Sequence, residues 1–246
     1  MKNMLAFAVL FSSALPAAGS TVSFESKPCP VCLAEVSYRD QMSATVFDTR
    51  LDFRPVGMII SPSPLPVCGE CGFVVFAGSA TPRELAAWRA AAASPEYRAL
   101  TGRGAYYRKA FLYEKLGWRD RSAIAGAYLK ASWEEDKEPE KEKEDLGLAL
   151  PNFDASLAEA GEGSDTWVML QYLRAELLRR LSRFPEAERA LASLRGHGAA
   201  EKAGLAEYIK YQRKLCGRKD PSPRAIGEMG KEGVFTKIGD FFRLLF

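Results

Sequence analysis

Two short stretches decide the fold of this chain: Lys-Pro-Cys-Pro-Val-Cys at residues 27–32 and Leu-Pro-Val-Cys-Gly-Glu-Cys-Gly-Phe at residues 65–73. Each contains two cysteines separated by two residues, in turns rich in proline or glycine. A C-x-x-C turn places two thiolates of one short loop at two corners of the tetrahedron that zinc prefers. Two such loops fill the coordination shell, which predicts a structural zinc site held by four thiolates, Cys29, Cys32, Cys68 and Cys71.

The segment between the two pairs has 35 residues, more than the ~15–20 of the simplest two-pair pattern, and it reads as strands. Apolar and polar side chains alternate from Thr45 to Phe53, and residues 57–60 could form a second strand. The proline-rich residues 61–66 predict an extended arm, and residues 73–76 a closing strand. Residues 24–78 are therefore expected to form a small zinc-ribbon-like β module.

The same alternation places charged residues together on the other face of the 45–53 strand. We expect this face to be solvated, with no catalytic acid and base, because no histidine or nucleophile stands near it in a motif. The residues concerned are Asp48, Arg50, Asp52 and Arg54.

The sequence leaves open other chemical roles for the four thiols. Two structural disulfides would use the same four residues, and iron accepts the same four thiolates as zinc. A thiol–disulfide oxidoreductase needs one C-x-x-C pair at the start of a helix in a βαβ frame, and neither flank has that pattern. The fifth cysteine, Cys216, stands alone in a helical stretch, which is typical of a half-buried helix thiol, with a reactive or intermolecular role as the alternative.

The first 19 residues have the order of a secretory signal peptide: a charge at Lys2, an apolar run from Met4 to Leu15, and small residues up to Gly19. This order predicts export to the periplasm or beyond. The alternative is a cytoplasmic protein with an uncleaved apolar helix. The compartment matters because an oxidising one would favour disulfides over a metal site.

After Gly78 the apolar periodicity changes from two to 3.6 residues, which predicts a helical domain over residues 81–216. Thr81-Pro82-Arg83-Glu84 has the pattern of a capping box. Two helix pairs follow, separated by residues 134–145, in which eight of twelve side chains are acidic. We interpret this acidic stretch as a solvated linker, so that the fold class is α+β.

The second helix pair resembles a tetratricopeptide repeat. The resemblance depends on Ala175 and Ala187 at the small positions of the two helices and on Phe184 at the turn. Such pairs bind proteins or peptides on a concave face, or else pack into a closed bundle.

The last segment, residues 217–246, is a basic tail. Residues 234–246 have an apolar stripe at helical spacing, which predicts an amphipathic helix that docks on the helical domain or contacts a membrane surface.

Nucleic-acid binding is disfavoured, because the net charge is only +3 and residues 27–78 carry four basic side chains without interleaved aromatic residues. The only histidine, His197, falls in a predicted loop between helices. No motif identifies a small-molecule substrate.

Taken together, the two cysteine motifs and Tyr-Leu-x-Ala-Ser-Trp at residues 128–133 resemble a bacterial family, the domain-of-unknown-function family numbered 2225. The similarity covers residues 27–194. It implies zinc at the four paired cysteines and tetratricopeptide-like helices after them, but no reaction. Leu33 departs from the family pattern, since a glycine often follows the first pair.

The sequence therefore predicts a non-catalytic zinc-binding scaffold whose helical domain binds a protein or peptide partner. An extracytoplasmic thiol–disulfide oxidoreductase is the first alternative, and nucleic-acid binding through the zinc module is the second.

Overall fold

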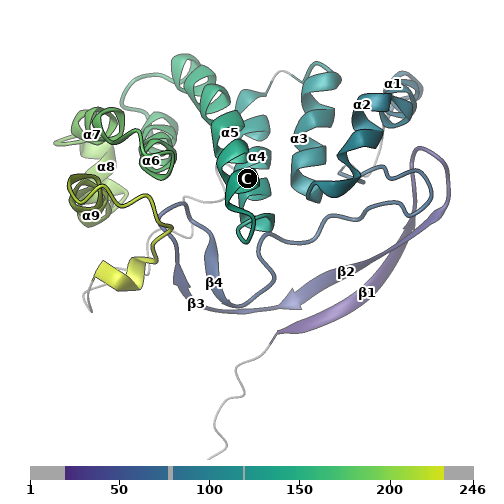
Figure 1. Cartoon of the computed structure of the whole chain (residues 1–246), viewed down its shortest axis with the longest axis horizontal. Helices are drawn as coiled ribbons and strands as arrows, with labels where there is room; N and C mark the ends of the chain where they lie inside the picture. The colour runs from purple at the N-terminus through teal and green to yellow at the C-terminus, as the bar shows by residue number, and fades with distance from the viewer. Residues whose placement is uncertain (1–19, 77–79, 119, 230–246) are drawn as a thin grey trace, which may run out of the picture.

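The computed structural model describes residues 20–76, 80–118 and 120–229. Figure 1 shows a row of helices in one layer and two β hairpins running beneath it. The described part therefore combines a small antiparallel β portion with a mostly helical region, as the sequence predicted at this coarse level. The signal peptide predicted at residues 1–19 and the helix predicted at residues 234–246 lie outside the described residues.

The first hairpin joins β1 (Thr21–Pro28) to β2 (Glu35–Ser43), with Phe24 opposite Arg39 and Pro28 opposite Glu35. The first cysteine pair lies in the loop between these strands. Sequence reasoning missed this hairpin, although Val22 and Phe24 in β1 and Val36, Tyr38 and Met42 in β2 alternate with polar residues.

The second hairpin joins β3 (Thr45–Thr49) to β4 (Pro55–Met58), with Thr45 opposite Met58. The strand predicted to continue to Phe53 stops at Thr49, because residues 51–53 turn into the helical layer and are buried. Phe53 stacks on Tyr172, with ring centroids 5.1 Å apart. The closing strand predicted at residues 73–76 is reduced to one bridge between Val67 and Val74.

The prediction of a solvated charged face on this strand was wrong for its central residues. The Asp52 side chain is only 1% exposed, and Arg50 is also buried. The Asp52 carboxylate accepts hydrogen bonds from Arg50 at 2.8 Å, from Arg180 at 2.7 Å and from the Trp133 indole at 3.1 Å. A buried carboxylate needs such partners, and two of them, Trp133 and Arg180, come from helices that the strand pattern could not place.

Two short helices follow the β part. Helix α1 (Pro82–Ala93) starts with the predicted capping box, in which Thr81 accepts the Glu84 N–H and the Glu84 carboxylate accepts the Thr81 N–H. Helix α2 (Pro95–Arg98) is capped by the Ser94 hydroxyl and continues as a single 3-10 turn, η1 (Ala99–Gly102). The start of α1 was predicted from its Thr81-Pro82 pair.

The next five helices form the centre of the layer, and each packs on the following one along the chain. They are α3 (Ala105–Lys115), α4 (Arg121–Glu134), α5 (Pro139–Glu159), α6 (Asp165–Arg180) and α7 (Phe184–Ser193). Antiparallel neighbours joined by short loops are the common arrangement of such helix hairpins.

The acidic stretch at residues 134–145 is not a linker, which corrects the interpretation of its composition. Most of it is the end of α4 and the first two turns of α5. Its acidic side chains have partners: Arg103 binds the carboxylates of Glu135, Glu144 and Asp145, and Glu135 also accepts the Gly104 N–H at the start of α3. A carboxylate at a helix N-terminus is stabilised by the helix dipole. The acidic side chains of this stretch therefore hold α5 and the end of α4 against the start of α3.

The C-terminal elements are α8 (Gly198–Lys202), α9 (Ala206–Gly217) and η2 (Ile226–Met229). Residues 218–229, predicted as the start of a basic tail, pack against the rest of the chain. The Arg179 guanidinium, fully buried beside Glu176, donates to the carbonyl groups of Asp220 and Ser222. The Gly227 N–H donates to the Asp48 carboxylate on β3.

The β part does not have a hydrophobic core separate from the helices in the described chain. Leu51 and Phe53 belong to the large core of α3–α9. The residues around the cysteine pairs share a second, smaller core with α1, α2 and α3, which includes Val36, Phe73, Trp88, Tyr97 and Leu112. The hairpins and the helices are therefore one packing unit.

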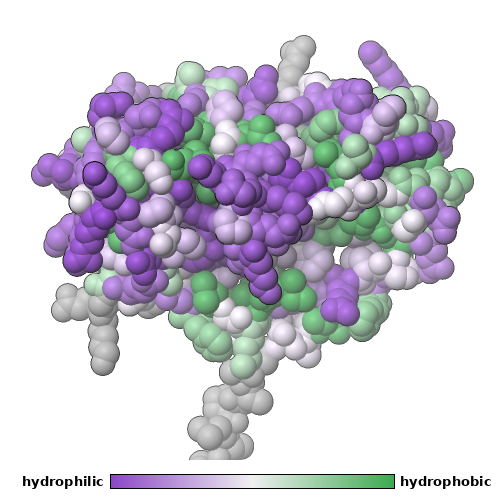
Figure 2. Space-filling view, viewed as in Figure 1, coloured by the Kyte–Doolittle hydropathy of each residue, from purple (hydrophilic) through white to green (hydrophobic). Residues whose placement is uncertain are grey.

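The outer surface of the hairpins is unusually apolar. Large apolar side chains on the strands there are exposed, among them Phe24, Met42 and Phe47, which are 76%, 66% and 56% exposed. Figure 2 shows this apolar surface along the lower edge of the molecule, below the polar helical layer.

Candidate metal centre

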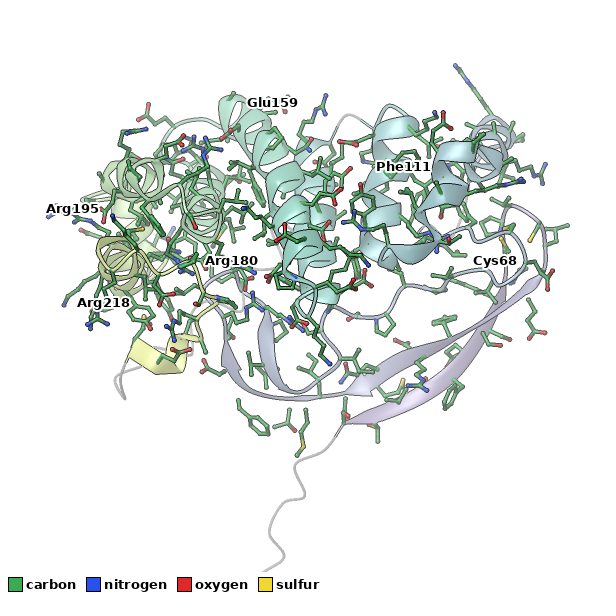
Figure 3. The ribbon with its side chains drawn as sticks, viewed as in Figure 1. Cys68, Phe111, Glu159, Arg180, Arg195 and Arg218 are labelled. Carbon is green, nitrogen blue, oxygen red and sulfur yellow. The ribbon has the colours of Figure 1, made fainter. Side chains whose placement is uncertain are left out.

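The structure brings together the four cysteines that the sequence predicted as ligands. Their sulfur atoms all lie within 4.8 Å of one another. Two close separations join the two loops: Cys29 Sγ is 3.6 Å from Cys71 Sγ, and Cys32 Sγ is 3.5 Å from Cys68 Sγ. Figure 3 places Cys68 beside the tip of the β1–β2 hairpin, at the end of the molecule that α1 and α2 cover.

These separations fit a four-thiolate metal site. A zinc–sulfur bond of ~2.3 Å implies sulfur atoms ~3.8 Å apart at the corners of a tetrahedron. Disulfide sulfurs would be ~2.05 Å apart, and all four cysteines are free. Moreover, close contacts join cysteines of different C-x-x-C pairs, as one shared metal site requires, whereas a redox-active pair forms its bond within one motif. The residues present therefore fit one tetrahedral thiophilic cation.

Both cysteine loops have the same backbone hydrogen bonds, and we call them the first knuckle (residues 29–34) and the second knuckle (residues 68–73). In the first, the Leu33 N–H donates to the Cys29 carbonyl and the Cys29 N–H to the Ala34 carbonyl. In the second, the Gly72 N–H donates to the Cys68 carbonyl and the Cys68 N–H to the Phe73 carbonyl. The two loops thus present their thiols as equivalent halves of one site.

The residue after each second cysteine has a positive φ angle, 68° at Leu33 and 71° at Gly72. Glycine adopts this conformation freely, whereas a leucine is strained in it by ~1–2 kcal/mol. Leu33 is 74% exposed, so its side chain gains little burial in return. The departure from glycine noted in the sequence therefore has a conformational cost at the metal centre.

Local backbone groups act on the thiols. Burial raises the pKa of Cys68, but N–H groups of Cys71 and Glu70 and the Cys32 thiol oppose it and lower the pKa to about 7. Burial raises the pKa of Cys29 despite N–H groups of Cys32 and Val31 directed at it. Such N–H groups stabilise thiolates, the form in which cysteine binds a metal.

Side chains from the helices hold the second knuckle in place. The Tyr97 hydroxyl of α2 donates to the Gly72 carbonyl at 3.1 Å and accepts the Val74 N–H at 3.1 Å. Arg108 of α3 also donates to the Gly72 carbonyl. Nothing in the sequence indicated these contacts, because the groups are 25 and 36 residues apart.

The first knuckle is fixed to the same helices. Arg89 of α1 donates from Nε to the Val31 carbonyl at 3.0 Å. Cys29 and Val36 are buried in the small core with Trp88, which stacks on Phe73 at 5.7 Å between ring centroids. The two knuckles therefore meet over a shared apolar base supplied by α1–α3.

The remaining residues singled out in the sequence lie elsewhere. Cys216 is 3% exposed on α9, and burial raises its pKa to about 11, which favours the inert thiol. His197 precedes α8, and its ring lies 5.3 Å from that of Trp167. Neither residue belongs to the thiol cluster.

No protein-family model, curated protein or solved structure matches this chain. Among the described residues, no helix has both the length and the apolar character needed to cross a membrane.

Proposed function

We propose that this protein binds one zinc ion through Cys29, Cys32, Cys68 and Cys71 and acts as a non-catalytic scaffold. The observation that carries the proposal is the convergence of four thiol sulfurs within 4.8 Å from loops 36–42 residues apart in sequence. Iron would use the same four ligands and is the alternative metal.

The donor set favours a structural role. Catalytic zinc sites keep one position open for water or substrate, whereas four thiolates fill a tetrahedral shell. The ion would neutralise thiolates that otherwise repel each other, and it would tie the tip of the β1–β2 hairpin to the second knuckle and so to α1–α3. The ion would thereby stabilise the folded state of the small core around the cysteine pairs.

A protein or peptide partner on the helical region completes the proposal. The antiparallel pair α6–α7 crosses closely, and Ala175 and Ala187 at the predicted small positions are fully buried. This supports a tetratricopeptide-like pair, and such pairs present binding surfaces. The family numbered 2225, which the sequence resembles, is expected to combine the same two features, two cysteine pairs and tetratricopeptide-like helices.

Metal analysis combined with thiol counting tests the proposal. Protein purified without added metal should contain one zinc per chain, and a chelator should release it and expose four reactive thiols. Two disulfides would instead require a reductant before any of the four reacts, and an oxidoreductase would show one pair that cycles without metal. Intact mass in the same preparation shows whether residues 1–19 have been removed, as the export proposal expects.

Matched serine variants sharpen the test. Cys29→Ser and Cys68→Ser each remove one ligand and should abolish stoichiometric zinc, while Cys216→Ser should retain one zinc per chain. Equal zinc in all three variants would contradict the assignment.

A further inference from the structure

A cavity of about 550 Å³ lies between the second knuckle and helices α1–α3. One wall is the knuckle itself, residues 69–72, and the opposite wall is formed by Ala92, Ala93 and Tyr97. Three arginines from three successive helices line it: Arg89, Arg98 and Arg108. The volume is within the range of small-molecule sites, which is ~300–1,000 Å³.

These three arginines have no carboxylate partner in the described part of the chain. Arg89 makes one hydrogen bond, to the Val31 carbonyl, and Arg108 contacts the Gly72 carbonyl and the Tyr97 hydroxyl. Elsewhere the buried arginines are paired: Arg179 binds Glu176, and Arg180 binds Asp52 and Glu142. Three guanidinium groups that form no salt bridge within the described residues therefore gather at one cavity, and Arg108 is attracted to the Glu134 carboxylate at longer range.

Arg108 is the strongest indication that the cavity takes a ligand. Its side chain is 93% buried, since only 7% is exposed, yet its Nε–H has no hydrogen-bond partner among the described residues. An unsatisfied buried donor costs ~1–3 kcal/mol, and more when it is charged. This nitrogen is itself closed to solvent, so an acceptor in the cavity removes that cost only if the Arg108 side chain turns toward it.

The charge of the cavity defines the ligand class. Apart from the metal-ligand thiol of Cys71, the charged side chains of the lining are three guanidinium groups and one carboxylate, Glu70, which together carry a net charge of +2. Guanidinium groups bind planar or tetrahedral oxyanions through paired hydrogen bonds, and a phosphate monoester is close to a dianion at neutral pH. We propose that this cavity, with Arg98 at its outer side and Arg108 at its base, binds the phosphate group of a small molecule or of a phosphorylated peptide.

The inference rests on the proposed function in one respect, since the metal-bound second knuckle forms a wall of the cavity. A different role for the arginines would be to balance the negative charge of a zinc–tetrathiolate centre. The two roles separate experimentally: a balancing role requires that loss of an arginine weakens zinc binding, whereas a phosphate site requires that it weakens phosphate binding.

The test is a titration of the zinc-loaded full chain with inorganic phosphate, followed by heteronuclear NMR and calorimetry. Phosphate should bind saturably and shift the resonances of Gly72 and Arg108, and Arg98→Ala should weaken binding about tenfold with zinc content unchanged. Arg83→Ala is the matched control, because Arg83 lies on α1 outside the cavity. Acetate, a monoanion, should bind more weakly than phosphate.

Glucose 6-phosphate and a phosphoserine tripeptide distinguish the two sources of the group, and tighter binding of either one identifies the source. Phosphate that fails to saturate on fully zinc-loaded protein would overturn the inference while leaving the zinc scaffold intact. An equal effect of Arg83→Ala and Arg98→Ala, or zinc loss in Arg98→Ala, would also overturn it. Chains without zinc would instead contradict the proposed function.

Discussion

Replacing Asp52 with asparagine removes the negative charge at the centre of the buried cluster that joins the β3–β4 turn to the helices. The change nearly preserves shape, and the amide oxygen can still accept the Arg54 N–H. It leaves Arg50 and Arg180, whose side chains are 11% and 2% exposed, without their shared carboxylate. The variant therefore tests whether this cluster connects the two layers.

Breaking a buried ion pair by removing one partner costs ~3–5 kcal/mol. Arg180 keeps a second carboxylate, Glu142, so we expect the lower end, a loss of about 3 kcal/mol in the free energy of unfolding. For a chain of this length that corresponds to a fall of ~6–12 °C in the Tm. Although burial alone would raise the pKa of Asp52, Arg50 and Arg180 lower it below its usual value. The charge therefore stabilises the fold at neutral pH, and this stabilisation is lost as the pH falls below about 4.

Thermal and urea unfolding of the zinc-loaded protein at pH 7 measure the effect. Asp136→Asn is the control, because it removes the same charge from a partly exposed pair with Arg54 and should cost less than ~1 kcal/mol. Asp52→Asn with a Tm within 2 °C of the parent protein, or Asp136→Asn with an equal loss, would refute the reasoning.

Three further predictions concern other parts of the molecule. Burial raises the pKa of Glu134 to about 7, so between pH 4.5 and 7 the folded carboxyl holds a proton that the unfolded chain has lost, and stability falls as the pH rises through this range. Glu134→Gln should therefore raise the Tm more at pH 8 than at pH 5.5. A difference in Tm that does not depend on pH would contradict this prediction. Leu33→Gly relieves a positive φ angle on an exposed residue and should stabilise the zinc-loaded protein by ~0.5–1 kcal/mol. Gly72→Ala places a side chain in the same conformation and should destabilise the protein by at least ~1 kcal/mol. Chemical denaturation measures both effects, and a loss of stability in Leu33→Gly or a gain in Gly72→Ala would contradict the prediction. Replacing Phe24 and Phe47 with threonine should reduce the fluorescence of a bound hydrophobic dye and change the Tm by less than ~2 °C, since both side chains are exposed; a large loss of Tm would show that they are packed.

The candidate metal centre is the part of the protein that its sequence predicts best. Cysteine spacing alone identified all four thiols, because the C-x-x-C turn is a local structure whose geometry follows from a few neighbouring residues. Capping at Thr81 was predicted for the same reason. Local rules therefore sufficed wherever the partners are close in sequence.

The errors came from residues whose partners are distant. Asp52 alternates with apolar neighbours as a solvated residue would, yet Trp133 and Arg180 bury it. The acidic composition of residues 134–145 suggested a linker, but Arg103 pairs with its carboxylates and the stretch is largely helical. Composition and period describe the chain, and they do not show which charges the fold brings together.

The cavity beside the second knuckle is a further example. Its three arginines come from α1, α2 and α3 and share no motif. No local pattern places Arg108 against the Gly72 carbonyl, 36 residues earlier in the chain. A sequence-based search for functional residues finds the thiols and misses the side chains around them.

Zinc K-edge X-ray absorption on protein of measured metal content tests the central claim most directly. The account predicts one zinc per chain, surrounded by four sulfur atoms at ~2.3 Å, in the parent protein and in Cys216→Ser alike. A chain without stoichiometric metal, or a shell that contains oxygen or nitrogen in place of one or more of the four sulfurs, would contradict it.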